Sequence, residues 1–471
     1  MGLSKLLYDK SPHLLRTALL NVYAYSLNFE RYGRDFERLM DEFARNEKLS
    51  RGELEEYQRE KLVALVHHAY EHVPYYRNVM KGLKLVPSDF KGLEDLAKLP
   101  VLTREDVKKN NRLLQADNVP KYRIRHGHTS GTTGSPLGFL WDLSVCTIHH
   151  VADWRQKGWA GLKLGDPFIS VQGRQVVPAT RQKPPFWVMN AVHNQLFMSS
   201  FHLKEEFLDS YVDKIRKFGP KGVEGYPSTL YILARHLKKR DRYCAVPAVL
   251  TSSETLLPIQ RELIEERFQC PVFDFYGMAE RVVYASECQY HRGKHLNMDY
   301  GIVEVVDNDN DPVSEGTLGT IVATGLWNHA MPLIRYRTSD VTAIHRGTCA
   351  CGRNFPLMDQ VTTKAEDIVL LEDGRMVPSS ILTHPFKPMD NIVKSQIIQI
   401  DTRTLDIYLV TNSNYSDSDS QLLLKGMKER VGSGMNINLR IVDDIPNEKS
   451  GKFRWVISKL EKGSQSDFYE G

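Results

Sequence analysis

The sequence has no long apolar run and few cysteines. The first absence argues against a membrane-spanning protein, and the second argues against a disulfide-rich one. No stretch approaches the roughly 20 consecutive apolar residues that cross a bilayer, so we expect no transmembrane segment. The start of the chain lacks the charged, apolar and small-residue succession of a signal peptide, which predicts a cytoplasmic protein. Six cysteines in 471 residues do not suggest a disulfide scaffold. The net charge of +4 is small and no basic stripe is interleaved with aromatics, so we expect no nucleic-acid partner.

The length of 471 residues exceeds what one hydrophobic core supports, so we expect two or three domains. Residues 1 to about 90 read as helical, with a periodic segment over 54–72 that ends before Pro74. The stretch 13–27 predicts an amphipathic helix, for which a membrane-surface role is an alternative. From about 125 to 345, short β-rich runs alternate with amphipathic segments, which is typical of a layered α/β domain.

Two regions allow individual elements to be predicted. Residues 248–253 and 271–276 read as buried strands, and Pro258 opens a helix that runs to Phe268. After about residue 365 the pattern changes to a hairpin over 368–377, strands over 392–400 and 404–411, a helix over 417–431 and a strand over 436–442. The sequence thus predicts an α/β fold, with a large multi-subdomain α/β N-terminal domain over 1–365 and a small mobile α+β C-terminal domain over 366–471.

The most specific local pattern lies between His128 and Pro136. Gly131 and Gly134 permit backbone shapes that other residues avoid, and the amides and hydroxyls around them can wrap phosphate oxygens. The string is no Walker A loop, because no Gly-Lys-Ser/Thr follows. A surface turn rich in Ser, Thr and Gly is the alternative. The ordered string favours phosphate binding by Thr129, Ser130, Gly131, Thr132, Thr133 and Gly134.

The same string resembles the phosphate-binding loop of the adenylate-forming superfamily, which includes acyl-CoA synthetases and firefly luciferase. Three later segments follow in the order of that superfamily's motifs: Tyr276-Gly277-Met278-Ala279-Glu280, Tyr336-Arg337-Thr338-Ser339-Asp340, and the run from Pro446 through Ser450-Gly451-Lys452. Within the superfamily the chain looks most like the phenylacetate-CoA ligase branch and its CapK relatives from capsular polysaccharide clusters. The features that carry this likeness are 73–77, 349–353 and 451–457.

The resemblance implies roles for the matching residues. Residues 129–134 would hold the β- and γ-phosphates, Glu280 would bind Mg²⁺, and Asp340 would accept hydrogen bonds from the ribose hydroxyls. Lys452 would neutralise charge that develops as pyrophosphate leaves. The adenine side would be formed by Ser253, Glu254 and Thr255, by Tyr276 stacking on the base, and by Gly277, Met278 and Ala279.

The chain departs from the motifs at three positions. Ala279 replaces a threonine, so one hydroxyl near the α-phosphate is absent and we expect a neighbouring group to compensate. Ser339 replaces a glycine. Lys364 stands where an arginine usually contacts ribose, and this leaves the hinge residue open between Glu366 and Asp367.

A second cluster consists of Cys288, His295, Cys349 and Cys351. Relatives of phenylacetate-CoA ligase often carry a structural zinc at the matching positions, and two thiolates one residue apart plus Cys and His from another loop can complete a tetrahedral site. His295 matches the position better than His291. Reduced, partly buried cysteines without a metal are the alternative.

The resemblance implies an AMP-forming acid–thiol ligase that uses ATP, Mg²⁺ and CoA. Three alternatives stay open: an adenylyl-transferring relative, like those that adenylylate a deazaflavin coenzyme; an enzyme that acylates an amine or hydroxyl of a sugar precursor; and a degenerate nucleotide-binding scaffold. The partner is a small-molecule carboxylate whose acyl pocket we place near 225–228. The sequence specifies neither this carboxylate nor the oligomeric state.

Overall fold

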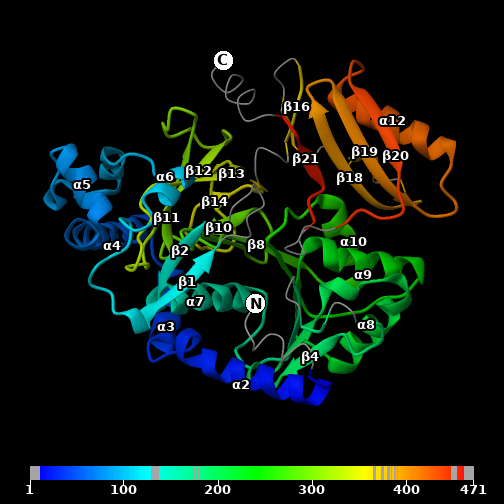
Figure 1. Cartoon of the computed structure of the whole chain (residues 1–471), viewed down its shortest axis with the longest axis horizontal. Helices are drawn as coiled ribbons and strands as arrows, with labels where there is room; N and C mark the ends of the chain where they lie inside the picture. The colour runs from blue at the N-terminus through cyan, green and yellow to red at the C-terminus, as the bar shows by residue number, and fades with distance from the viewer. Residues whose placement is uncertain are drawn as a thin grey trace.

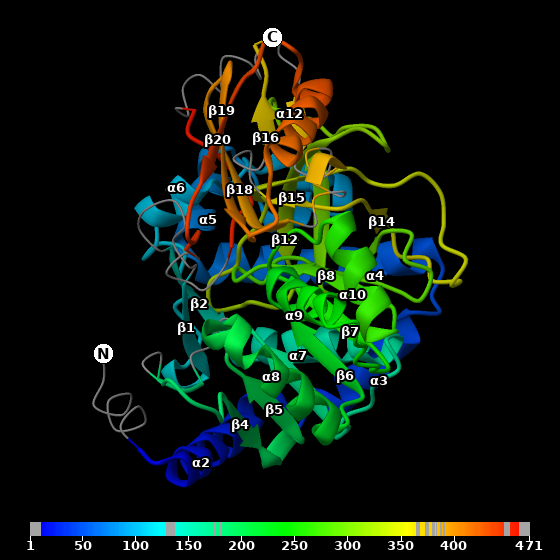
Figure 2. The ribbon, with the colours of Figure 1, turned by 90° about the vertical axis from the view of Figure 1, so that its right-hand side faces the viewer.

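The computed structural model describes residues 11–128, 137–172, 176–178, 181–363, 368–372, 376–378, 382, 384–386, 389, 391–446 and 453–460. They form a large mixed α/β domain and a smaller C-terminal domain, which lies at the end of the molecule opposite helix α2 (His13–Arg31) (Figures 1 and 2). The predicted fold class is confirmed. The boundary between residues 365 and 366 stays a prediction, since residues 364–367 lie outside the described ranges.

Helices fill the N-terminal region as predicted: α2, α3 (Phe36–Asn46), α4 (Arg51–His72) and α5 (Pro74–Gly82). A capping box starts α4, where the Ser50 hydroxyl accepts from the Glu53 N–H and the Glu53 carboxylate accepts from the Ser50 N–H. The prediction that the helix over 54–72 ends before Pro74 is confirmed, because α4 ends at His72. The helical region continues beyond it, since Pro74 is the first residue of α5, where its missing N–H costs no hydrogen bond. No helix among the described residues is long and apolar enough to cross a membrane.

A nine-stranded sheet forms the centre of the large domain, in the order β14-β10-β9-β8-β7-β6-β3-β5-β4. The central strands β5, β3, β6, β7 and β8 are parallel, and antiparallel strands flank them on both sides. Their bounds are β3 (Phe168–Val171), β4 (Trp187–Asn190), β5 (Gln195–Met198), β6 (Gly222–Gly225), β7 (Val249–Ser252), β8 (Val272–Gly277), β9 (Tyr284–Glu287), β10 (Lys294–Leu296) and β14 (Leu357–Met358).

Helices cover both faces of this sheet. α3 and α7 (Leu143–Trp159) share one apolar core with it. α8 (Glu205–Phe218), α9 (Pro227–Lys239) and α10 (Pro258–Phe268) share the other, as Figure 1 shows. The loops after β6, β7 and β8 therefore emerge at one edge of the sheet, which is where α/β sheets place ligands. Both predicted strands and the predicted helix in this region are confirmed.

Two further β units complete the large domain. One is the hairpin of β1 (Ile124–His128) and β2 (Gly138–Asp142). The other is an antiparallel sheet of β11 (Gly301–Val306), β12 (Gly319–Gly325), β13 (Tyr336–Thr342) and β15 (Thr362–Thr363). This sheet shares an apolar core with α4, α5 and the short helix α6 (Arg104–Lys109).

The small domain follows the predicted element order. It contains the hairpin of β16 (Ile368–Leu370) and β17 (Met376–Pro378), β18 (Ile392–Asp401), β19 (Thr404–Thr411), α12 (Asp417–Val431), β20 (Asn436–Ile441) and β21 (Val456–Ser458). Its sheet has the order β20-β19-β18-β21. Because β21 pairs in parallel with the central β18, the segment that precedes β21 enters the domain from a fixed side.

Candidate active site

The hairpin of β1 and β2 frames the segment predicted to bind phosphate. His128 pairs with Gly138 across the hairpin, so residues 129–136 connect its two strands. The predicted phosphate-binding residues Thr129, Ser130, Gly131, Thr132, Thr133 and Gly134 lie outside the described residues, as do Lys364 and Lys452. Their roles stay predictions.

The hairpin is tied to the motif at 276–280 by Trp141. The Trp141 indole Nε1–H donates to the Ala279 carbonyl oxygen at 3.1 Å, and the Arg281 guanidinium lies 3.9 Å from the centre of the indole ring. A Cβ at Gly127 would approach the Trp141 and Phe139 rings to 2.5 and 2.6 Å, so only glycine fits beneath these rings. This role of Trp141 could not be predicted, because no local sequence pattern links Trp141 to a segment so far along the chain.

Two tyrosines join the motifs at 276–280 and 336–340 in a crossed arrangement. The Tyr276 hydroxyl donates to Asp340 Oδ2 at 2.6 Å, and the Tyr336 hydroxyl donates to Glu280 Oε1 at 3.1 Å. Each motif thus supplies the tyrosine that holds the carboxylate of the other. We refer to these four residues as the crossed pairs.

The carboxylates of the crossed pairs lie in an environment that favours a cation. Glu280 is 7% exposed, and burial raises its pKa; the charge of Asp340 acts in the same direction, while the Tyr336 hydrogen bond opposes it. Burial, and then Asp340, raises the pKa of Tyr276, which keeps this phenol a neutral donor. A buried carboxylate near a second one is a hard-oxygen ligand of the kind that binds Mg²⁺, so Glu280 fits the metal-binding role.

The predicted adenine loop follows β7 and is organised by Glu254. Ser253 has a φ of 70°, which turns the chain sharply at the end of the strand. Glu254 accepts hydrogen bonds from the Ser228 N–H and hydroxyl, both at 3.0 Å, and so lies at the N-terminus of α9. A carboxylate is favoured there by the helix dipole. Glu254 therefore links the predicted adenine loop to the segment predicted to border the acyl pocket.

Glu254 also contacts the small domain. The Phe453 N–H donates to Glu254 Oε1 at 3.1 Å, and Lys394 Nζ lies 5.0 Å from the centre of the Phe453 ring. Phe453 follows the predicted catalytic Lys452 directly in the sequence. The described residue next to Lys452 thus reaches the edge of the large-domain sheet where the motif loops gather.

The predicted zinc ligands come together. Cys288 follows β9, His295 lies in β10, and Cys349 and Cys351 lie in the loop before β14; their ligand atoms all lie within 4.8 Å of one another. Cys288 Sγ is 3.5 Å from Cys349 Sγ, and Cys351 Sγ is 3.4 Å from His295 Nε2. Burial, and then the charge of Arg353, lowers the pKa of His295 to about 4, so its imidazole is neutral. Three cysteines and one histidine from two loops, with their ligand atoms at these distances, fit a tetrahedral zinc site.

His291, the alternative ligand, lies elsewhere. Its Nδ1 is 3.2 Å from the Glu287 carboxylate, and it is not part of the described Cys/His group. The loop that carries Cys349 and Cys351 is instead fixed to the N-terminal helices, since Arg353 pairs with Glu47 at 2.8 Å. The cluster therefore fastens the end of α3 to the edge of the central sheet.

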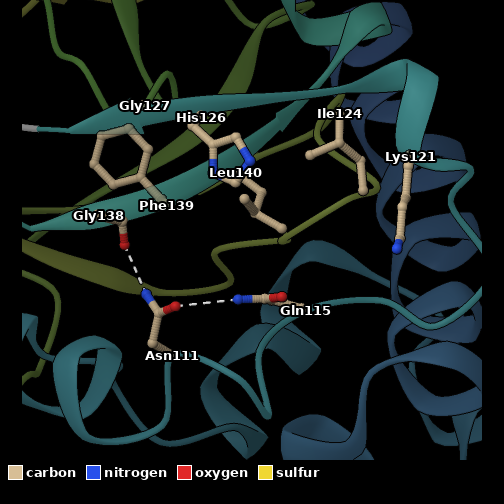
Figure 3. Close-up of a pocket in the computed structure, with 9 residues that line it drawn as sticks. All are labelled: Asn111, Gln115, Lys121, Ile124, His126, Gly127, Gly138, Phe139 and Leu140. Atoms are coloured by element: carbon tan, nitrogen blue, oxygen red, sulfur yellow. Dashed lines mark hydrogen bonds between the residues drawn. The ribbon is translucent and has the colours of Figure 1, made fainter. Parts of the chain in front are cut away.

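A cavity of about 480 Å³ lies between β1, β2 and the segment around residues 111–121 (Figure 3). Asn111 Nδ2 donates to the Gly138 carbonyl at 2.7 Å, and Gln115 Nε2 donates to Asn111 Oδ1 at 3.1 Å. The chain is thereby held immediately after the predicted phosphate loop. Among the residues that the structure describes, no predicted site residue lines this cavity.

Comparisons with known proteins found related sequences. Residues 369–459 match the family described as the CapK C-terminal domain. Protein CapK of Staphylococcus aureus is 24% identical over 470 residues, which is 97% of this chain and 99% of the relative. A phenylacetate-coenzyme A ligase of Thermus thermophilus is 25% identical over 441 residues, 87% of this chain and 98% of the relative.

Solved structures of 2-hydroxyisobutyryl-CoA ligase share the fold. In its postadenylation state, with R3-HIB-AMP bound, this ligase superposes with a TM-score of 0.70 at 19% identity, over 91% of this chain and 94% of the ligase. In its thioesterification state, with 2-HIB-AMP and CoA, the TM-score is 0.55 at 20% identity over the same shares. The chain is therefore similar in sequence, over most of its length, to CapK and the phenylacetate-CoA ligases, and it shares the fold of a solved CoA ligase.

Proposed function

We propose that the protein is an AMP-forming acid–thiol ligase, which activates a carboxylate with ATP and transfers the acyl group to CoA. The observation that carries this proposal is the crossed pairs, because they bring a candidate metal ligand and a candidate ribose ligand together at one edge of the sheet. Relatives named phenylacetate-coenzyme A ligase over most of the chain support the reaction class.

The nucleotide would lie over this edge. Asp340 would accept from the ribose hydroxyls, Glu280 would bind the Mg²⁺ that accompanies the phosphates, and Tyr276 would border the adenine. Tyr276 is buried and already donates to Asp340, so its main contribution is to orient that carboxylate. The remaining nucleotide contacts would come from residues 129–134, 253–255 and 277–279, and from Lys364.

In the first step a carboxylate oxygen attacks the α-phosphorus of ATP. The new O–P bond gives the acyl-adenylate, and the α–β bridge breaks so that pyrophosphate leaves with the electron pair. Lys452 would neutralise the charge that grows on the phosphate oxygens. The contact between Phe453 and Glu254 supports this role, as does the higher TM-score with the postadenylation state of the ligase.

In the second step the CoA thiolate attacks the acyl carbon, and AMP leaves. This step requires the small domain, residues 366–471, to move so that Lys452 withdraws and the thiol can enter, which is a gating motion. The hinge would lie at Glu366 or Asp367. Zinc bound by Cys288, His295, Cys349 and Cys351 would serve structure alone.

The test is a library of carboxylates assayed by exchange of labelled pyrophosphate into ATP. We predict that Lys452→Ala lowers the exchange rate by roughly two orders of magnitude, the scale of removing an electrostatic stabiliser. Lys459→Ala, in the same C-terminal segment, is the matched control and should retain the wild-type rate. Unchanged exchange in Lys452→Ala would remove this lysine from the mechanism.

A second candidate is transfer of the acyl group to a sugar amine or hydroxyl in capsular polysaccharide synthesis. The relative named CapK, which matches over 97% of the chain, favours it. Adenylyl transfer without an acyl product would be a third activity, and nucleotide binding without turnover would make the protein a scaffold. Thioester formation on addition of CoA separates the ligase from all three, and pyrophosphate exchange separates the enzymes from the scaffold.

A further inference from the structure

Helix α2 turns its apolar face away from the protein. Seven large apolar side chains of this one helix are exposed, with exposed fractions of 84% for Leu14, 70% for Val22 and 76% for Phe29. The full set is Leu14, Leu15, Leu19, Val22, Tyr23, Tyr25 and Phe29. Figures 1 and 2 both show α2 along the outer edge of the molecule. A surface helix normally does the reverse and packs its apolar stripe on the core.

The inward side of α2 carries only two buried apolar side chains, Leu20 and Ala24, and is also held by polar contacts. Asn21 Nδ2 donates to the Met189 carbonyl at 2.9 Å, and Asn21 Oδ1 accepts from the Ala191 N–H at 2.7 Å. Arg16, 3% exposed, is among the three buried residues of the helix. These contacts fix the rotation of α2 about its axis. The outward apolar stripe is therefore a feature of the folded protein.

The stripe carries no charge. Between Arg16 and Glu30 the helix contains no charged residue, and the exposed positions recur three to four residues apart, so they form one continuous face. We call this set of seven side chains the α2 stripe. Each of the seven side chains keeps at least 41% of its surface exposed among the described residues.

We propose that the α2 stripe is the interface with a second copy of this chain, with the two α2 helices packed antiparallel about a two-fold axis. Seven side chains with these exposed fractions present on the order of 800 Å² of surface, which matches the area that each partner contributes to a standard stable interface. An uncharged stripe can meet its own copy without bringing like charges together, as an isologous contact requires. This inference does not depend on the proposed activity.

Charge decides between the possible occupants. A helix that lies on an anionic membrane displays a polar face rich in Lys and Arg beside its apolar one, whereas the polar side of α2 is docked on the protein. Charge also sets the direction of pairing. Arg31 is the last residue of α2 and Arg34 comes three residues later, so a parallel pair would bring four arginines together at one end. An antiparallel pair separates them and opposes the helix dipoles favourably.

The test is the mass in solution, measured by light scattering after gel filtration. We expect the wild-type chain to have twice the chain mass and Val22→Glu to be monomeric, because Val22 is the midpoint of α2 and would face its own copy across the axis. Leu318→Glu is the matched control: Leu318 is 60% exposed and directly precedes β12, in the sheet that packs on α4 and α5, and this variant should remain dimeric. A monomeric wild type, or a dimeric Val22→Glu, would overturn the proposal.

Cysteine substitution tests the direction of pairing. Under mild oxidation, Val22→Cys should form a covalent dimer, whereas Leu14→Cys should not, because eight residues along a helix place it about 12 Å from the axis. Preferential cross-linking of Leu14→Cys would contradict the antiparallel arrangement. If the wild type is monomeric, its flotation with vesicles of equal parts phosphatidylcholine and phosphatidylglycerol can be measured. Flotation that is lost in Val22→Glu would assign the α2 stripe to a membrane surface.

Discussion

Tyr276 and Tyr336 hold equivalent places in their motifs, yet each serves the carboxylate of the other motif. A phenol that donates to a carboxylate fixes the direction of its lone pairs and favours its charged form. Tyr336 therefore acts on the metal side of the site through Glu280, and Tyr276 acts on the ribose side through Asp340. The two hydroxyls can be removed separately, which allows the two sides to be tested independently.

We predict that Tyr336→Phe weakens the requirement for Mg²⁺ specifically. A hydrogen bond to a charged group contributes about 1.5–3 kcal/mol, so the Mg²⁺ concentration for half-maximal pyrophosphate exchange should rise about tenfold or more. Mg²⁺-dependent protection of the protein against thermal unfolding in the presence of ATP gives a second readout. Tyr211→Phe is the control, because it also removes a buried hydroxyl, bonded to the Ser199 carbonyl at 2.7 Å, but on α8 in a different core. An unchanged Mg²⁺ dependence would show that Tyr336 does not position Glu280.

Tyr276→Phe should have the complementary effect. Without the phenol, Asp340 loses the donor that orients it, so the KM for ATP should rise by about tenfold while the Mg²⁺ dependence stays as in the wild type. The readouts are the KM in pyrophosphate exchange and the Kd of ATP from calorimetry. Equal changes in the two variants would mean that the crossed pairs act as one structural unit and do not divide the site into two sides.

At the scale of elements, the loop before β14 connects parts that are distant in the sequence. It brings Cys349 and Cys351 to the ends of β9 and β10, and its Arg353 pairs with Glu47 at the end of α3. A metal at this cluster would reinforce the pairing of β9, β10 and β14 at the point where the loop also contacts α3. Zinc would then contribute to the docking of the N-terminal helices on the sheet and would have no part in the chemistry.

We predict that the purified protein contains one zinc per chain and that Cys349→Ser lowers both its zinc content and its stability. Loss of a structural zinc ligand should lower the midpoint of thermal unfolding by about 5 °C or more. Elemental analysis and calorimetry are the measurements. Cys270→Ser, at a buried cysteine outside the cluster, should keep its zinc. A wild-type protein that is free of zinc after expression in zinc-supplemented medium would refute the assignment.

Much of the element order could be predicted from the sequence, because local signals determine it. Pro258 starts α10, and the periodicity over 417–431 coincides with α12. The antiparallel sheet of β11, β12, β13 and β15 could not be predicted, since its pairing joins strands that no local pattern relates.

The contacts within the candidate site could not be predicted either, for the same reason. Motif order identified Glu280 and Asp340, but only the fold shows that Tyr336 serves Glu280 and that Trp141 bonds to Ala279.

The contact between Glu254 and Phe453 joins the two domains at the loop predicted to bind adenine. At the scale of the whole molecule, this contact therefore affects how the small domain docks on the large one. Glu254 accepts from two groups of Ser228 in the large domain and from the Phe453 N–H in the small one. A glutamine at this position would replace one carboxylate oxygen by an N–H₂ group, which cannot accept a hydrogen bond from Ser228 or Phe453. Glu254→Gln should therefore weaken the docking of the small domain by about 1–3 kcal/mol without altering either domain.

We predict that Glu254→Gln lowers pyrophosphate exchange by about tenfold and increases the radius of gyration measured by small-angle X-ray scattering with ATP and Mg²⁺ present. Transfer from a preformed acyl-adenylate to CoA should be spared, since that step needs the small domain to leave this contact. Glu266→Gln, at a glutamate of α10 that pairs with Arg267 on the surface, is the control and should match the wild type in all three measurements. If both half-reactions fall equally, Glu254 acts within the nucleotide site itself, and the docking of the small domain must depend on other contacts.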